Sequence, residues 1–133
     1  MAVLLAATGV QAGEIKLELQ GKSLAGNKIH IAVYSASQSK QFPVADKFYR
    51  SVVSEAAGES LTVFVPDLPP GKYAVAVYVD SNKNGMHDKN LFGVPKEDYG
   101  FSNDARGRFG PPDFADAAFE IGDDTVSRSI HIH

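Results

Sequence analysis

The sequence contains no cysteine among its 133 residues, and this absence excludes several kinds of site. Without cysteine the chain cannot form a disulfide framework, offer a thiolate nucleophile, or bind zinc or an iron–sulfur cluster through sulfur. Its length is enough for one hydrophobic core and short for two. We therefore expect a single domain.

The sequence also lacks an excess of positive charge. It carries 13 lysines and arginines against 16 aspartates and glutamates, for a formal net charge of −3, and the basic residues are scattered along the chain. A protein that binds a phosphate backbone gathers its basic residues into a patch or stripe. We therefore expect no nucleic-acid partner.

Long apolar runs are missing as well. No segment after residue 12 approaches the ~20 apolar residues that a membrane-spanning helix needs, so we expect no membrane span. Residues 1–12 are uncharged, rich in small apolar residues, and end in Val10-Gln11-Ala12. They resemble the end of a secretory signal peptide cleaved after Ala12, although the basic start of such a peptide is absent. We expect a residual signal peptide over residues 1–12 and export to the periplasm or the exterior; the alternative is a frayed or strand-forming N-terminus.

The main pattern that the sequence does contain is alternation of apolar and polar residues with a period of two. Such alternation is typical of strands with one buried face. It predicts strands over residues 15–20, 28–34, 61–65, 73–80, 114–121 and 126–132, and a short strand within 42–57 after a helical turn near Pro43. Residues 73–80 are apolar on both faces, which predicts a central strand. About seven strands predict an all-β fold, a two-sheet antiparallel β-sandwich of the immunoglobulin or prealbumin kind over residues 13–133.

The connection over residues 81–113 shows no alternation. A connection of this length is either functional or disordered. Disordered segments are poor in aromatic residues, whereas residues 81–114 include Phe92, Tyr99, Phe101, Phe109 and Phe114. We expect an ordered lid loop over residues 81–113, folded across one end of the sandwich with its aromatic residues against the core.

The start of this lid carries the pattern of a calcium loop. An EF-hand loop takes its ligands from positions 1, 3, 5, 7 and 9, with a backbone carbonyl at 7 and a glycine at 6. Gly85 stands at the glycine position, and the matching ligands are Asp80, Asn82, Asn84, the Met86 carbonyl and Asp88. We predict one calcium ion here, and the same residues would also suit a metal-free turn.

The predicted calcium site departs from the EF-hand at position 12, where Leu91 replaces the usual bidentate glutamate. Calcium takes six to eight oxygen ligands, so the remaining ones would have to come from Glu97, Asp98, Asp104 or water. With only two carboxylates in the loop, we expect weak affinity, in the range of extracellular calcium modules.

Other lid residues form a candidate ligand surface, made of Tyr99, Phe101, Asn103, Arg106 and Arg108. The two arginines could clamp an anion, or they could lock the lid to Asp98 or Asp113. His131 and His133 lie on one face of the last strand and could bind zinc if His30 were beside them, although histidines at a chain end are usually solvated.

Four segments of the chain together resemble one protein family. They are Leu68-Pro69-Pro70-Gly71-Lys72-Tyr73-Ala74-Val75-Ala76-Val77, Asp80-x-Asn82-x-Asn84-Gly85, Gly93-x-Pro95-x-Glu97-x-Tyr99-Gly100-Phe101-Ser102-Asn103 and Gly110-Pro111-Pro112-x-Phe114. This combination is similar to the bacterial family of unknown function numbered 2141 over about residues 13–132. The resemblance implies an export signal and a β-sandwich fold. It brings no established activity with it.

These features predict an exported calcium-binding β-sandwich that acts as a binding module for a protein, peptide or glycan, as a monomer or weak oligomer. The alternative is a small secreted hydrolase or carbohydrate-active protein with carboxylates under the lid. The sequence has no Gly-x-Ser-x-Gly elbow, no His-Glu-x-x-His helix and no phosphate-binding glycine loop, and these absences weigh against an enzyme.

Overall fold

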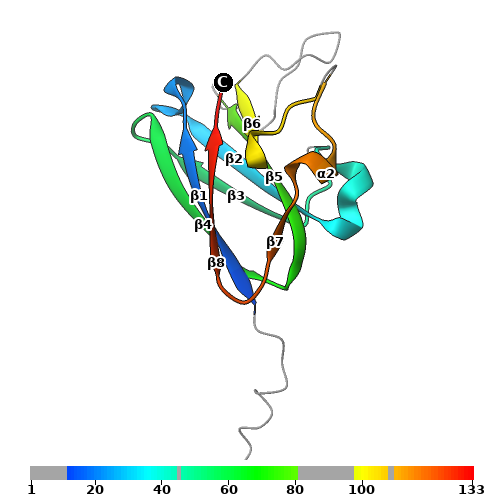
Figure 1. Ribbon diagram of the computed structural model, residues 1–133. Coiled ribbons are helices and arrows are strands. Elements are labelled where there is room, and N and C mark those ends of the chain that lie inside the picture. The colour runs from blue at the N-terminus through cyan, green and yellow to red at the C-terminus, as the bar shows by residue number, and fades with distance from the viewer. Residues whose placement is uncertain (1–11, 45, 81–97, 108–109) are drawn as a thin grey trace, which may run out of the picture.

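Two β-sheets packed face to face make up the computed structural model (Figure 1), which describes residues 12–44, 46–80, 98–107 and 110–133. One sheet has three strands in the order β4-β1-β8, and the other has five, in the order β3-β2-β5-β6 with β7 also on β5. The strands are β1 (Gly13–Gln20), β2 (Lys28–Ser35), β3 (Arg50–Glu55), β4 (Ser60–Leu68), β5 (Gly71–Asp80), β6 (Tyr99–Phe101), β7 (Phe119–Ile121) and β8 (Thr125–His131). The predicted all-β sandwich is confirmed, with one strand more than expected.

The alternation that predicted the strands is the alternation of buried and exposed side chains in the structure. In β1, Ile15, Leu17 and Leu19 are fully buried, and in β2 Ile29, Ile31 and Val33 are fully buried opposite them. Because successive side chains of a strand point to opposite faces, each sheet contributes one apolar face to the core between them. Strand β5 is central, as predicted, since it pairs with β2, β6 and β7.

One strand pair differs from the predicted antiparallel arrangement. Strands β1 and β8 pair in parallel, with Ile15 opposite Val126 and Leu19 opposite Ile130. All the other pairs among the described strands are antiparallel. Parallel partners need a long crossover connection. Here the connection from β1 to β8 runs over residues 21–124 and contains the other six strands described.

The structure differs from the predicted elements in three places. The strand expected over residues 114–121 is a short helix, α2 (Phe114–Ala117), followed by the three-residue strand β7. The helical turn expected near Pro43 comes earlier, as the 3-10 helix η2 (Ala36–Gln41). The lid is not wholly a loop, because β6 joins the five-stranded sheet and is followed by the 3-10 helix η3 (Ser102–Asp104).

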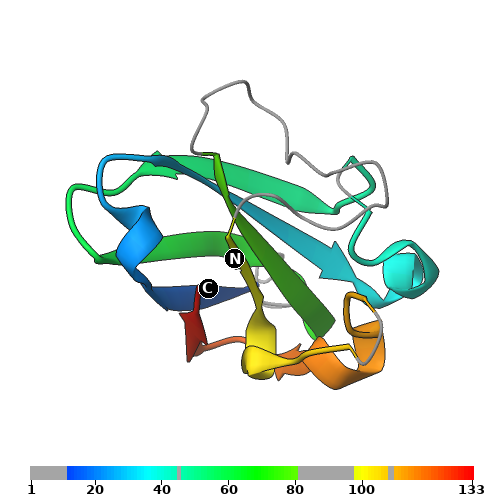
Figure 2. The same ribbon diagram turned by 90° about the horizontal axis from the view of Figure 1, so that it is seen from above.

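A second apolar cluster lies on the outer face of the five-stranded sheet. Its floor is flat because Ala32, Ala74 and Ala76 are small, and Ala32 lies directly opposite Ala76 in the β2–β5 register. The rings of Phe42, Phe101 and Phe114 cover this floor, with Phe42 edge-on to each of the other two at 5.9 and 6.1 Å between ring centroids. Figure 2 shows η2 and α2 side by side at this end of the sheet. The expected packing of lid aromatics against the body of the protein is thus confirmed for Phe101 and Phe114.

Among the described residues, none of the helices has the length and hydropathy of a bilayer-spanning segment. The 3-10 helix η1 (Lys22–Leu24) is the remaining element of the described residues, and it places the buried Leu24 in the central core.

Candidate functional site

The described part of the predicted calcium loop is its first residue, Asp80, at the end of β5. Its side chain is buried, with 1 % exposure, and its Oδ2 lies 3.3 Å from Nε2 of His30, which is 22 % exposed. His30 belongs to β2 and faces Tyr78 in the register, so Asp80 is its diagonal neighbour on the outer face of the sheet. A carboxylate buried this deeply needs compensating positive charge or hydrogen bonds. The structure therefore holds the Asp80 carboxyl group in a fixed place at the start of the predicted calcium loop.

The aromatic neighbour of this pair is uncharged over the ordinary pH range. Burial raises the pKa of the Tyr78 hydroxyl above its ordinary value of 10.0. The neutral Tyr78 hydroxyl therefore adds no negative charge beside the contact between His30 and Asp80.

The other predicted calcium ligands Asn82, Asn84, Met86 and Asp88, and the auxiliary candidate Glu97, lie outside the described residues. Asp98 is described, and its backbone carbonyl accepts a hydrogen bond from the Val79 amide at 3.0 Å, which brings it next to Asp80 along the β5–β6 ladder. Within the described ranges, no group of three or more histidine, aspartate or glutamate side chains is placed to hold a metal ion.

The remaining auxiliary candidate, Asp104, is engaged by a different element. Its Oδ1 accepts a hydrogen bond from the His131 backbone amide at 2.9 Å, and its Oδ2 lies 2.8 Å from Nδ1 of the His131 ring. Burial raises the pKa of the Asp104 carboxyl, but these hydrogen bonds and the charges of His131 and His133 lower it by more, so its pKa lies below the ordinary 3.8. Asp104 thus acts as a charged acceptor that fastens η3 to β8.

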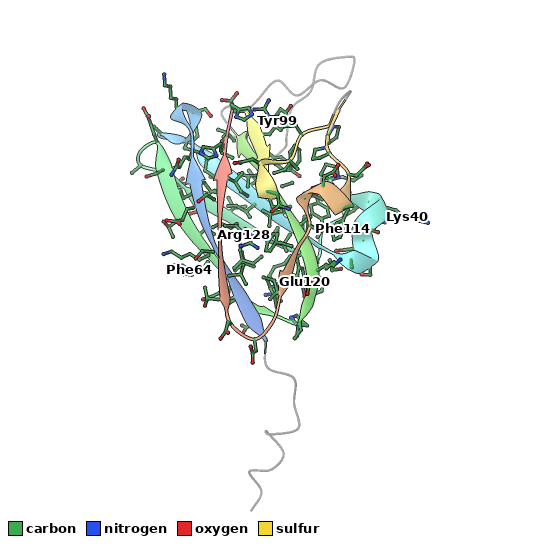
Figure 3. All side chains as sticks on the ribbon, viewed as in Figure 1. Lys40, Phe64, Tyr99, Phe114, Glu120 and Arg128 are labelled. Atoms are coloured by element: carbon green, nitrogen blue, oxygen red, sulfur yellow. The ribbon has the colours of Figure 1, made fainter. Side chains whose placement is uncertain are left out.

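A cavity of about 90 Å³ lies beside this contact, lined in part by Tyr99, Arg106, His131 and His133. Tyr99 is at the end of the sandwich where β8 ends (Figure 3), and its amide donates to the His133 carbonyl at 3.2 Å. The Arg106 guanidinium contacts the His133 ring. Two predicted ligand-surface residues, Tyr99 and Arg106, therefore line the same cavity. His131 and His133, which the sequence suggested only as possible zinc ligands, line it as well.

The other predicted members of the ligand surface have structural positions. Phe101 is 7 % exposed and belongs to the second apolar cluster. The Asn103 amide donates to the carbonyls of Asp116 and Ala118 at 3.2 and 2.9 Å, which ties it to the end of α2. Arg108 lies outside the described residues. Of these predicted surface residues, Phe101 is buried, whereas Asn103 is exposed and its side chain is held by α2 and Ala118.

Two alternatives raised by the sequence are also corrected. Arg106 contacts His133, and no ion pair with Asp98 or Asp113 is formed among the described residues. The three histidines do not converge, because His30 pairs with Asp80 on the five-stranded sheet while His131 pairs with Asp104 beside the three-stranded one. The zinc site that would have needed all three is not supported.

The residue that sequence reasoning missed is Ser102. It is completely buried, accepts a hydrogen bond from the Val75 amide at 2.9 Å, and donates to the Ala117 carbonyl at 2.6 Å. The glycine two residues earlier, Gly100, lies so close to β8 that an added Cβ would be 2.7 Å from the His131 carbonyl oxygen. Both residues belong to the Gly-Phe-Ser-Asn segment that was noted in the sequence. The structure shows that this segment packs closely against β5, β8 and α2.

This architecture can be compared with known proteins. Residues 18–129 match the model of the family described as "Uncharacterized protein conserved in bacteria (DUF2141)". The chain belongs to the DUF2141 family. No curated protein and no solved structure matches it. The DUF2141 match extends from the middle of β1 to near the end of β8, so it includes both sheets, the Asp80 loop and the Gly-Phe-Ser-Asn segment.

Proposed function

We propose that this DUF2141 chain is an exported β-sandwich that binds one calcium ion through the loop beginning at Asp80 and acts as a binding module. The observation that supports the proposal is the position of the Asp80 carboxylate, 1 % exposed at the end of the central strand. Because β5 has strands on both sides, the first ligand is held on rigid backbone, and a ligand group held in this way loses little freedom on binding.

The expected affinity follows from the ligand set. Asp80 and Asp88 supply the only carboxylates of the five predicted positions, and few charged ligands give dissociation constants of roughly 10⁻⁴ to 10⁻³ M. This range suits a protein that works outside the cytoplasm, where export would place it. At calcium concentrations a hundredfold above the dissociation constant, binding would stabilise the fold by ~2.7 kcal/mol.

The test is thermal unfolding with excess calcium and with a chelator, with magnesium as the control ion. We expect calcium to raise the midpoint by several degrees and magnesium to raise it much less, because Mg²⁺ demands a tighter octahedral shell. Asp80→Asn should remove the calcium-dependent rise, whereas Asp123→Asn, in the exposed turn before β8, should retain it.

Loss of the His30 contact could lower the stability of the Asp80 variant in any buffer, so the quantity to compare is the difference between calcium and chelator. His30→Gln controls for that contact: it should lower the midpoint in both buffers and keep the calcium-dependent difference. A wild-type midpoint that is the same in calcium and in chelator would refute the calcium site.

The binding-module role is favoured over the hydrolase alternative by the chemistry around Asp104. A general acid in a glycosidase needs a raised pKa, whereas the pKa of Asp104 is lowered by its contacts with His131. The cavity beside it, about 90 Å³, is small compared with typical ligand sites of ~300–1,000 Å³. Screening of glycan and peptide libraries with and without calcium would identify the partner, and turnover of a library substrate would reverse this choice.

A further inference from the structure

The small cavity at the end of the sandwich has walls of closely packed backbone. It has a volume of about 90 Å³ and lies where β6 meets the end of β8. On this side, the amides of Tyr99 and His133 each donate to the carbonyl of the other at 3.2 Å. In the loop after η3, an added Cβ on Gly107 would collide with the carbonyl oxygens of Gly110 and Pro111. The side chains that line the cavity are therefore carried by backbone with little room to shift.

The charged side chains at this cavity leave the Arg106 guanidinium without a carboxylate partner. Both carboxylate oxygens of Asp104 are engaged by His131, one by its amide and the other by its ring. Among the described residues, Arg106 forms hydrogen bonds only with the His133 ring, through Nη2, and it forms no ion pair. A guanidinium carries five N–H donors in a fixed fork. Most of the donors of Arg106 are therefore available at the wall of the cavity.

We propose that this cavity binds a carboxylate group of a ligand, with the Arg106 guanidinium as its main partner and the His133 ring beside it. The planar guanidinium fork matches the two oxygens of a carboxylate and binds them through two parallel hydrogen bonds. The proposal deepens the binding-module role and rests on it, but it does not require the calcium ion.

The size of the cavity suits the end group of a ligand. A single water molecule needs ~10–15 Å³ of such space, so about 90 Å³ accommodates the few atoms of a carboxylate group and its first carbon. The rest of the ligand would lie outside the cavity, where Arg106 and His133 are exposed. A peptide or an acidic glycan could supply such a group.

The charge of Asp104 favours a carboxylate over a phosphate. The pKa of Asp104 lies below its ordinary value of 3.8, so this side chain is negatively charged at neutral pH. Arg106 balances the single charge of a carboxylate. A phosphate carries roughly −1.5 to −2 at pH 7, and its additional charge would be repelled by Asp104 in the same wall.

The test is an NMR titration with sodium acetate that follows the ring signals of His133. It is done at fixed pH and ionic strength, in a buffer freed of calcium by a chelating resin. We expect saturable binding with a dissociation constant on the order of 1–10 mM, as two charge-assisted hydrogen bonds provide.

Two arginine variants show whether the binding depends on Arg106. Arg106→Gln should weaken acetate binding at least tenfold. Arg128→Gln is the matched control, because it removes the same charge from the middle of β8, where Arg128 stacks on the Phe119 ring (Figure 3). It should bind acetate like the wild type. Circular dichroism checks that both variants are folded.

A third variant tests the charge argument in the opposite direction. Asp104→Asn keeps a side chain suited to positive φ and removes the negative charge from the cavity wall. It should bind acetate roughly two- to fivefold more tightly than the wild type. Sodium phosphate should bind the wild type more weakly than acetate does. N-acetylglycine and galacturonate carry the carboxylate on a peptide and on a sugar, and the tighter of the two identifies the source of the group.

Four outcomes would overturn the carboxylate site. They are a wild-type protein without saturable shifts up to roughly ten times the expected dissociation constant, acetate binding that Arg106→Gln leaves unchanged, weaker acetate binding by Asp104→Asn, and tighter binding of phosphate than of acetate. Because these titrations contain no calcium, their result is independent of the calcium-dependent melting that tests the loop at Asp80.

Discussion

At the scale of single residues, the turn after β6 depends on two side chains that tolerate an unusual backbone. Asn103 and Asp104 have φ values of 61° and 49°. Asparagine and aspartate adopt this left-handed region more readily than other side chains. The two residues reverse the chain, so that the Asp104 carboxylate reaches the His131 amide and ring.

This geometry predicts an acid-dependent contribution to stability. The pKa of Asp104 is lower in the folded protein than its ordinary value of 3.8, so the folded state favours the charged form. The stabilisation is present above the pKa of the unfolded chain and is lost as the pH falls through the folded pKa. Because Asp104 is 46 % exposed, the contribution should be about 1 kcal/mol or less.

The measurement is urea unfolding at pH 5 and at pH 3. Asp104→Asn keeps a side chain suited to positive φ and should lose less stability between these two pH values than the wild type. Asp67→Asn is a matched control, since Asp67 has a φ of 59° and is exposed, and it should follow the wild-type profile. An Asp104→Asn profile parallel to that of the wild type would contradict the assignment.

At the scale of elements, Ser102 joins three of them. Its hydroxyl links η3 to the Val75 amide of β5 and to the Ala117 carbonyl of α2. Removal of this hydroxyl would leave two buried backbone groups without this partner, and each such group costs ~1–3 kcal/mol.

Ser102→Ala should therefore lower the free energy of unfolding by about 2 kcal/mol, as measured by chemical denaturation. Ser129→Ala, on the exposed face of β8, should change it by less than ~0.5 kcal/mol. If the two variants are equally stable, Ser102 does not have the joining role that its contacts indicate.

The elements also show what the sequence could and could not predict. The strands β1, β2, β4, β5 and β8 have seven to ten residues each, which is long enough for alternation to be visible. Strands β6 and β7 have three residues each, so a period of two cannot be recognised in them. They are strands because β5 offers them a partner, and that is a long-range effect.

The candidate site was predictable to a similar extent. The spacing of Asp80 with the oxygen-bearing residues after it is local and therefore visible in the sequence. The burial of Phe101 was not, because an aromatic ring suits a ligand surface as well as a packed interior. Its contact with Phe42, 59 positions earlier in the chain, is a long-range effect. The hydrogen bond of the exposed Asn103 to Ala118, 15 residues away, is long-range as well.

At the scale of the whole molecule, the sheet order determines which strands should open last. Strands β1, β2 and β5 each have a partner on both sides, whereas β3 and β4 are at edges among the described strands. Buried strands with two partners exchange their amide hydrogens through openings whose free energy approaches that of global unfolding.

Hydrogen exchange measured by mass spectrometry should therefore be slowest in peptides from β1, β2 and β5. Exchange in β3 as slow as in β2 would contradict the observed order of strands.

The parallel pairing of β1 with β8 has a consequence for the newly made protein. Glu14 and Thr125 are partners although 111 residues separate them. While the chain is still growing on the ribosome, β1 can find β4 but has nothing to pair with on its other side. The smaller sheet is finished only once residue 131 is available, so its last folding step must follow synthesis of every residue from β1 to β8.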